Sequence, residues 1–294
     1  MENKDILVSA LARGGRVRVY VCQSTHIVKT AQKKHDLWGT ATIALGRTLT
    51  IGAIMSELLK GDHQKLTIVI RGGGPIGQIM VDATSHGTVR GFVSEPHVEL
   101  TYNKDNTHAV GMAVGKEGYL KVIRDIRLRN SFSGTTELIS GEIAEDFAFY
   151  FAASEQIPTA VSAAVLLESD EVVSAGGIII QMMPEATEAD IVAAEAALKN
   201  HEPITYSLRD GKTPSAIAKE LFEDTKLIHA RRIDFRCDCS RERMYRALTV
   251  VDRDELVDMI EKDHGAEVTC NYCNAKYQFT EQELRDLLPH DLVH

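Results

Sequence analysis

The chain has 294 residues and a formal net charge of −9, with 44% apolar and 26% charged side chains. This composition is that of a folded globular protein and excludes a disordered or collagen-like chain. The longest apolar runs, VSAAVLL and GGIIIQMM, are too short to cross a bilayer, and the start MENKDILVSA has an acidic residue where a signal peptide would carry positive charge. We therefore expect a cytoplasmic protein with two domains, or with one large domain and an appendage.

Residues 1–183 are predicted to form an α+β core domain around an antiparallel or mixed β-sheet. The long segment 38–61 is rich in small and apolar residues, as a buried helix is. Segments 109–115 and 118–126 are expected to pair as a hairpin. Further strands are expected where the sequence alternates or is continuously apolar between turns, at 16–24, 65–72, 77–84, 88–94, 159–168 and 171–183.

A second core helix is expected after Ser140, because Ile143, Phe147 and Phe151 recur every four residues. Phe149 and Tyr150 add two more aromatic rings to the same helix. This clustering predicts packing in the core. Because four rings on one helix cannot all face the same side, at least one is expected to remain accessible to a partner.

The character of the chain changes at position 184. Thr187 precedes the Ala-rich helix 188–200, and Thr213 precedes a helix that begins at Pro214, so both threonines occupy N-cap positions. We interpret 184–232 as a helical linker segment that lacks a core of its own.

The tail, 233–294, is predicted to be a small C-terminal domain. Two of its helices carry capping boxes, Asp252 with Glu255 and Thr280 with Glu283. The tail holds 14 acidic and 8 basic side chains, a net charge of −6. Such a surface disfavours binding to nucleic acid, because phosphate backbones require basic partners.

The glycines of RGGGPIGQ have the G-x-G-x-x-G spacing of a dinucleotide-binding turn, at Gly72, Gly74 and Gly77. A dinucleotide site requires this turn to begin a helix, whereas Pro75 and the alternating QIMVDAT continue into a strand. The pattern therefore favours a β-turn or bulge, and we expect no nucleotide to bind.

Other reactive residues carry weak signals. Cys22 lies inside a predicted strand, where a thiol usually acts as a small apolar group. His26, His35 and His108 have no partners at the spacing of a catalytic triad. We therefore predict no catalytic residue and no enzyme.

Four of the five cysteines lie close together near the end of the chain, as two short pairs: Cys237, Cys239, Cys270 and Cys273. Two close pairs about thirty residues apart supply the four thiolates of a tetrahedral structural Zn²⁺ site. His264 and His290 lie nearby, but four sulfurs already complete the shell. We predict one Zn²⁺ per chain and no open coordination position for hydrolytic chemistry.

The short spacing gives this predicted centre a second property. Sulfurs this close in sequence can share one metal or react with each other, so oxidation has a local disulfide available in each half, with loss of Zn²⁺. A tail of about sixty residues is marginally stable without a metal. Oxidation is therefore expected to unfold it.

These cysteines, with the segments RGGGPIGQ, YFAASEQIPTA (150–160) and AGGIIIQMMP (175–184), resemble the redox-regulated heat-shock protein 33 family, the 33 kDa chaperonin. The resemblance implies a cytosolic, ATP-independent holdase that is inactive when reduced and zinc-bound. Peroxide or hypochlorite, aided by heat, would join Cys237 to Cys239 and Cys270 to Cys273 and eject zinc. The tail and linker would then unfold, and the active form, commonly a homodimer, would hold unfolding clients.

Two alternatives stay open at the level of the sequence. A zinc-ribbon protein that binds nucleic acid is disfavoured by the acidic tail. A thiol oxidoreductase would use Cys270 and Cys273 as a catalytic pair, and it would require a thioredoxin-like unit that the residues around NYCNAK do not indicate.

Overall fold

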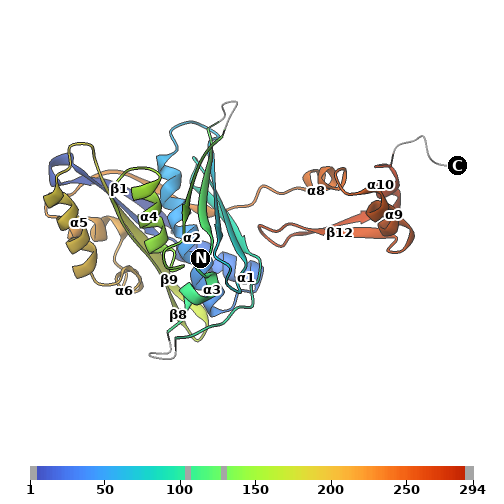
Figure 1. Ribbon diagram of the computed structural model, residues 1–294, viewed down its shortest axis with the longest axis horizontal. Helices are drawn as coiled ribbons and strands as arrows, with labels where there is room; N and C mark the ends of the chain where they lie inside the picture. Colours follow the sequence, from blue (N-terminus) through green and yellow to red (C-terminus); the bar gives the residue numbers. More distant parts are fainter. Residues whose placement is uncertain (1–4, 103–106, 127–130, 289–294) are drawn as a thin grey trace. The chain divides into compact units, whose positions relative to one another are not determined.

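The computed structural model of the chain describes residues 5–102, 107–126 and 131–288. It divides into two compact units, Met1–Arg236 and Cys237–His294. The first unit combines two β-sheets with helices, and the second combines a two-stranded sheet with three short helices (Figure 1). The predicted α+β class is confirmed. Within the described ranges, no helix has both the length and the apolar character required to cross a membrane.

The first sheet of the first unit has five strands, and all of its pairs are antiparallel. Its order is β10 (Lys226–Arg232), β1 (Ile6–Ala12), β2 (Val17–Gln23), β9 (Glu171–Met182) and β8 (Thr159–Glu168). The edge strand β10 contains a bulge. Ser9 pairs with His229 and Ala10 with Leu227, so Ile228 has no partner on β1 and is 56% exposed.

The second sheet has six strands and is mixed, because its edge strand β11 is parallel to β5 and its other pairs are antiparallel. Its order is β11 (Asp234–Phe235), β5 (Thr88–Val93), β4 (Gln78–Thr84), β3 (Lys65–Arg71), β6 (Tyr119–Asp125) and β7 (Phe132–Glu137). Ile233 alone separates β10 from β11, so one continuous segment adds an edge strand to each sheet. The sequence predicts one antiparallel or mixed sheet, whereas the structure has two sheets, one antiparallel and one mixed.

Helix α2 (Gly39–Met55) is the centre of the first unit (Figure 1). It contacts β8 and β9 of the first sheet and β4 and β5 of the second. Each of its residues except Arg47 is buried, which its small and apolar side chains permit. The predicted helix 38–61 is therefore correct in its body but ends earlier, at Met55, and is followed by the 3₁₀ turn η2 (Ser56–Leu58).

The remaining elements of the core are η1 (Arg13–Gly15), α1 (Thr25–His35), α3 (Val110–Val114) and α4 (Ala144–Ala153). Helix α4 contains the predicted aromatic cluster. Phe147, Tyr150 and Phe151 are buried, whereas Phe149 is only partly buried. Packing in the core is thus confirmed for three of the four rings, and the availability of a ring to a partner stays a prediction.

The predicted hairpin of 109–115 with 118–126 is wrong in its first half, because Val110–Val114 is the short helix α3. Tertiary contacts determine this conformation. The N–H of Gly111 donates to Glu142 Oε1 at 2.9 Å, and the carbonyls of Ala113 and Val114 accept from Ile76 and Gly74. Residues from two distant loops thus hold α3, and β6 pairs with β3 and β7 instead.

Three helices of the predicted linker segment lie on the first sheet: α5 (Glu188–Asn200), α6 (Ile204–Arg209) and α7 (Pro214–Leu221) (Figure 1). Their apolar side chains join the buried cluster of that sheet. Ile204, Leu208, Ile217 and Leu221 pack in one cluster with strand residues such as Val19. The helices therefore have no core of their own, and they cover apolar side chains of β1, β2 and β9.

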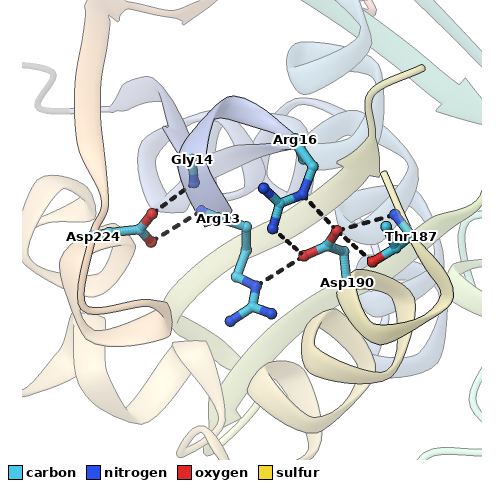
Figure 2. A network of polar contacts seen from close by, with 6 residues as sticks. All are labelled: Arg13, Gly14, Arg16, Thr187, Asp190 and Asp224. Carbon is cyan, nitrogen blue, oxygen red and sulfur yellow. Dashed lines mark hydrogen bonds and ion pairs between the residues drawn. The ribbon is translucent and has the colours of Figure 1, made fainter. Parts of the chain in front are cut away.

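Two aspartates hold this helical segment to the turn η1 (Figure 2). Asp190, in the first turn of α5, accepts from the N–H of the N-cap residue Thr187, and its carboxylate also accepts from Arg13 Nε at 3.0 Å and Arg16 Nε at 2.8 Å. Asp224, which follows α7, accepts from the backbone N–H groups of Arg13 and Gly14 at 2.9 and 2.8 Å. We call this set of contacts the aspartate clasp.

The backbone of η1 explains how one carboxylate receives two adjacent N–H groups. Arg13, Gly14 and Gly15 have φ values of 56°, 67° and 92°. Consecutive residues near the left-handed region turn their N–H groups toward one point and create a small anion-binding concavity. The sequence Arg-Gly-Gly supplies this geometry because glycine adopts positive φ without steric cost.

The second unit contains α8 (Arg241–Leu248), α9 (Arg253–Glu261), β12 (Gly265–Thr269), β13 (Lys276–Thr280) and α10 (Glu281–Arg285). Thr280 forms the predicted capping box with Glu283. Asp252 caps α9 as predicted, but its carboxylate accepts from the N–H of Asp254 and the predicted box with Glu255 is not formed. The fully buried apolar cluster is small, consisting of Leu248, Leu256, Ile260, Phe279 and Leu284. A unit with so few buried side chains has little intrinsic stability.

Candidate metal centre

The four clustered cysteines come from two different local structures. Cys237 and Cys239 lie in the extended stretch before α8, whose N-cap Ser240 accepts from the N–H of Arg243. Cys270 and Cys273 lie in the turn between β12 and β13. The carbonyl of Cys270 accepts from the N–H groups of Cys273 at 3.2 Å and Asn274 at 2.8 Å, so the turn is closed.

The fold brings the two pairs together. All four Sγ atoms lie within 4.8 Å of one another and could hold one metal ion. Cys237 Sγ lies 3.7 Å from Cys270 Sγ, and Cys239 Sγ lies 3.4 Å from Cys273 Sγ. Tetrahedral zinc with Zn–S bonds of about 2.3 Å places its sulfurs about 3.8 Å apart. The separations therefore fit a four-sulfur site.

The same distances bear on the chemistry of the thiols. All five cysteines lie in the described residues, and each is a thiol rather than half of a disulfide. Because the four clustered sulfurs are mutual neighbours, each can reach a sulfur of its own pair or of the other pair. The arrangement thus offers both metal binding and disulfide formation.

The surroundings of Cys239, Cys270 and Cys273 shift the pKa values of these thiols in different directions. Burial raises the pKa of Cys270 and of Cys273, since a thiolate is poorly solvated there. Burial acts the same way on Cys239, but hydrogen bonds from Tyr277 and from neighbouring thiols outweigh it and lower the pKa of Cys239. The Tyr277 hydroxyl donates to Cys239 Sγ at 3.1 Å, and this bond raises the pKa of Tyr277 to about 12.

The charged side chains discussed with the cysteines in the sequence lie at the surface. Asp238 pairs with Arg243 at 3.1 Å, and both side chains are about half exposed. His264 is 72% exposed and pairs with Glu281 at 3.3 Å. The prediction that His264 lies outside the metal shell agrees with this placement. His290 lies outside the described residues.

The structure accounts for the glycine-rich loop RGGGPIGQ without a nucleotide. The loop joins β3 to β4, as the predicted turn requires, and does not begin a helix. A Cβ on Gly72 or Gly74 would overlap carbonyl oxygens of 113–115, so these glycines permit close backbone packing. The N–H groups of Gly74 and Ile76 donate to carbonyls at 2.9 and 3.0 Å, which leaves neither for a phosphate.

The other reactive residues considered from the sequence, Cys22 and His108, belong to the first unit. Cys22 is fully buried on β2, and burial raises its pKa well above the ordinary value of a thiol. His108 bonds to Glu99 at 2.8 Å beside the N-terminus of α2, and the buried Thr40 hydroxyl next to this pair donates to the carbonyl of Leu100 at 2.9 Å.

Tyr277 also contacts the cysteine cluster, and the sequence does not predict this contact. Tyr277 contacts the centre because β13 pairs with β12, which brings Tyr277 opposite Val268 beside the cysteine turn. The only signal in the sequence was its position four residues after Cys273 in an alternating strand. That position does not reveal which sulfur the hydroxyl meets, because Cys239 comes from the other pair.

The chain was compared with known proteins. The family model described as "Hsp33 protein" matches residues 5–280. The 33 kDa chaperonin of Oceanobacillus iheyensis is 45% identical, over 97% of this chain and 99% of its own length. The 33 kDa chaperonin of Clostridioides difficile is 42% identical over 97% of this chain and 99% of its own length.

A solved structure extends the comparison to the fold. The crystal structure of the 33 kDa chaperonin of Thermotoga maritima, a heat shock protein 33 homolog, has a TM-score of 0.89 and 36% sequence identity. The similarity covers 96% of this chain and 97% of that chain. These matches assign a chaperone function, which implies binding of unfolded proteins, and not an enzymatic reaction. The chain belongs to the Hsp33 family of 33 kDa chaperonins.

Proposed function

We propose that this chaperone is a redox-regulated, ATP-independent holdase of the cytoplasm, inactive when reduced and zinc-bound. In this proposal Cys237, Cys239, Cys270 and Cys273 are the ligands of one Zn²⁺ and also the redox switch. The observation that carries it is the convergence of four thiols, from two separate local structures, within 4.8 Å. A bound Zn²⁺ would join the two structures and stabilise the unit that contains them.

The size of the second unit supports its dependence on metal. Five apolar side chains form its fully buried cluster. Structural zinc contributes about 10–16 kcal/mol of apparent folding free energy in small modules. We infer that the proposed domain 233–294 cannot replace a contribution of this size by packing, so it unfolds when its thiolates are oxidised.

The oxidation proposed here is a two-electron reaction at each pair. One thiolate attacks peroxide, the O–O bond breaks, and the sulfur becomes a sulfenic acid while hydroxide leaves. The second thiolate of the pair attacks that sulfur, forms the S–S bond and displaces a second hydroxide. The proposed products are Cys237–Cys239 and Cys270–Cys273, and each disulfide removes two metal ligands.

The linker segment 184–232 supplies a route from the tail to apolar surface. Its helices α5, α6 and α7 cover a buried apolar cluster on the first sheet. We propose that unfolding of the tail extends into this segment, which would expose that cluster to unfolding clients. The proposal includes a homodimer as the active form and no nucleotide, nucleic-acid or membrane partner.

Hydrogen exchange combined with a light-scattering assay tests the proposal. Reduced, zinc-loaded protein is expected to protect the amides of 237–288 and to leave a heat-denaturing client free to aggregate. Peroxide at elevated temperature is expected to release about one Zn²⁺ per chain, remove that protection and suppress aggregation. Reductant with zinc should reverse these changes.

Two controls sharpen the result. Cys239→Ser removes one proposed ligand and should bind zinc poorly, whereas Cys22→Ser should bind it normally. The proposed redox switch is contradicted if the amides of 237–288 stay protected from hydrogen exchange in the oxidised protein, or if the reduced protein suppresses aggregation equally well. The cysteine site would then have a structural role alone.

The two alternatives have less support. A zinc-ribbon protein that binds nucleic acid conflicts with the net charge of −6 in the tail. A thiol oxidoreductase would require a thioredoxin-like unit, whereas Cys270 and Cys273 lie in the turn of a two-stranded sheet.

A further inference from the structure

Tyr277 connects the two halves of the cysteine centre. Its backbone belongs to β13, on the hairpin that presents Cys270 and Cys273, but its hydroxyl donates to Cys239 of the other half at 3.1 Å. Within the cluster, the Cys237 and Cys270 sulfurs lie 3.7 Å apart, and the Cys239 and Cys273 sulfurs lie 3.4 Å apart. Cys239 therefore receives a specific hydrogen-bond donor from the hairpin that presents the other cysteine pair.

A hydrogen bond to a thiolate changes its reactivity toward an oxidant. Attack on peroxide uses an electron pair of sulfur, and a donor that binds this pair must be displaced or weakened as the S–O bond forms. Groups in the second shell of a metal site tune their ligand in this way. The donated bond should thus slow oxidation of Cys239 while the sulfur remains a thiolate.

We propose that Tyr277 is a positioning residue that protects the Cys239 sulfur from oxidation through its hydroxyl. The inference rests on the proposed redox function and adds a determinant of its rate. In the protected state the hydroxyl donates to Cys239 Sγ. When peroxide oxidises this sulfur by two electrons, the O–O bond breaks, hydroxide leaves, and the hydrogen bond to the thiolate is lost.

The chain provides a matched control in Tyr245. This tyrosine is also partly buried against the small core of the second unit, and its hydroxyl donates to the carbonyl of Glu283 at 3.0 Å. Removing either hydroxyl leaves the ring in place and costs one hydrogen bond of similar length. Of these two tyrosines, Tyr277 donates to a sulfur and Tyr245 to a carbonyl, so the two variants separate protection of sulfur from stability of the unit.

The experiment measures where oxidation begins. Zinc-loaded wild type, Tyr277→Phe and Tyr245→Phe are treated briefly with peroxide in the presence of dimedone, which traps sulfenic acid. Mass spectrometry then quantifies the adduct at each cysteine at low conversion. We expect Tyr277→Phe to increase the initial adduct at Cys239 about tenfold, with less than about a twofold change at Cys237, Cys270 and Cys273.

Two outcomes would contradict the proposed protection of Cys239 by Tyr277. An unchanged adduct at Cys239 means that the hydroxyl does not protect the sulfur. A parallel increase at all four cysteines means that Tyr277 only stabilises the unit, and Tyr245→Phe would then show a similar increase.

Zinc release and client aggregation are followed in the same wild-type samples. If wild type loses zinc without suppressing aggregation, the holdase proposal fails while the adduct ratio still tests Tyr277.

Discussion

Cys22 is the fifth cysteine, and its surroundings separate it from the other four. It lies on β2 between β1 and β9, with no exposed surface, and burial raises its pKa well above the ordinary value. A thiol of this kind is a poor nucleophile, because only the thiolate reacts with peroxide. The residue therefore acts in packing.

Cys22→Ser is expected to leave zinc content and peroxide-driven zinc release unchanged. It should lower the free energy of unfolding of the first unit by about 1–3 kcal/mol, because a buried hydroxyl without a partner is costly. Metal analysis and urea denaturation measure the two effects. A large loss of zinc would instead place Cys22 in the mechanism.

Asp5 is a buried carboxyl group at the start of β1. It is 2% exposed, and it accepts from the N–H groups of His26 and Ile27 at 3.1 and 2.7 Å. Burial raises the pKa of Asp5 to about 6, although these two bonds oppose the shift. Near neutral pH the folded protein thus holds an unfavourable buried charge.

The sign of the resulting pH dependence follows from the raised pKa. The contribution of Asp5 to stability is fully present below its unfolded pKa near 3.8 and is lost as pH rises through about 6. Lowering the pH from 7 to 5 should therefore stabilise the first unit by up to about 1.4 kcal/mol per pH unit. Urea denaturation of wild type and Asp5→Asn at both values checks this, and equal pH slopes would contradict it.

At the scale of elements, the aspartate clasp determines how firmly α5 is attached to the first sheet. The Asp190 side chain is inaccessible to solvent, whereas Arg13 and Arg16 are each 38% exposed. The hydrogen bond from Arg16 and the N–H of Thr187 hold the pKa of Asp190 well below its usual range. The carboxylate therefore stays charged, and its stabilisation is lost only as pH falls below the usual range for Asp.

Asp190→Asn should increase hydrogen exchange in α5 at neutral pH, because the neutral amide cannot replace the ion pairs with both arginines. Wild-type α5 should keep its protection from pH 7 to pH 5. Asp210→Asn is the matched control, since Asp210 is 55% exposed and pairs only with its neighbour Arg209 among the ion pairs described. Equal exchange in the two variants would mean that the clasp does not hold α5.

Local signals in the sequence were sufficient for some elements. Thr213 and Thr280 cap α7 and α10 as predicted, because an N-cap depends on residues within one turn. Strands β4 and β5 alternate as amphipathic strands do, and their buried faces follow that pattern. The cysteine pairs were found for the same reason, since each spacing is local.

Other elements depend on distant residues and were missed or wrong. The sequence GMAV fits a strand or a helix, and the bond from Gly111 to Glu142 belongs to its helical form. Strand β10 is largely exposed, so it lacks the apolar alternation that identifies a strand. Tyr277 likewise required knowledge of which residues pair across β12 and β13. Tertiary pairing decides all three cases.

At the scale of the whole molecule, the two units should differ in their dependence on metal. The first unit buries a large core around α2, whereas the second has the five-residue cluster centred on Phe279. Removing zinc with a chelator under reducing conditions should therefore unfold the second unit and leave the first folded. Hydrogen exchange should show lost protection across 237–288 and retained protection in β2 and β9. Uniform protection after chelation would contradict the proposed role of zinc.

The bulge in β10 has a consequence for the behaviour of the chaperone at high concentration. A regular edge strand presents a row of unpaired N–H and C=O groups to which a strand from another copy can add. Ile228 interrupts this row, and the edge also carries the cations Lys226 and Arg232. Edge-to-edge polymerisation through β10 is thereby discouraged. A protein that meets unfolding, strand-forming chains can in this way stay dispersed instead of seeding fibrils of its own.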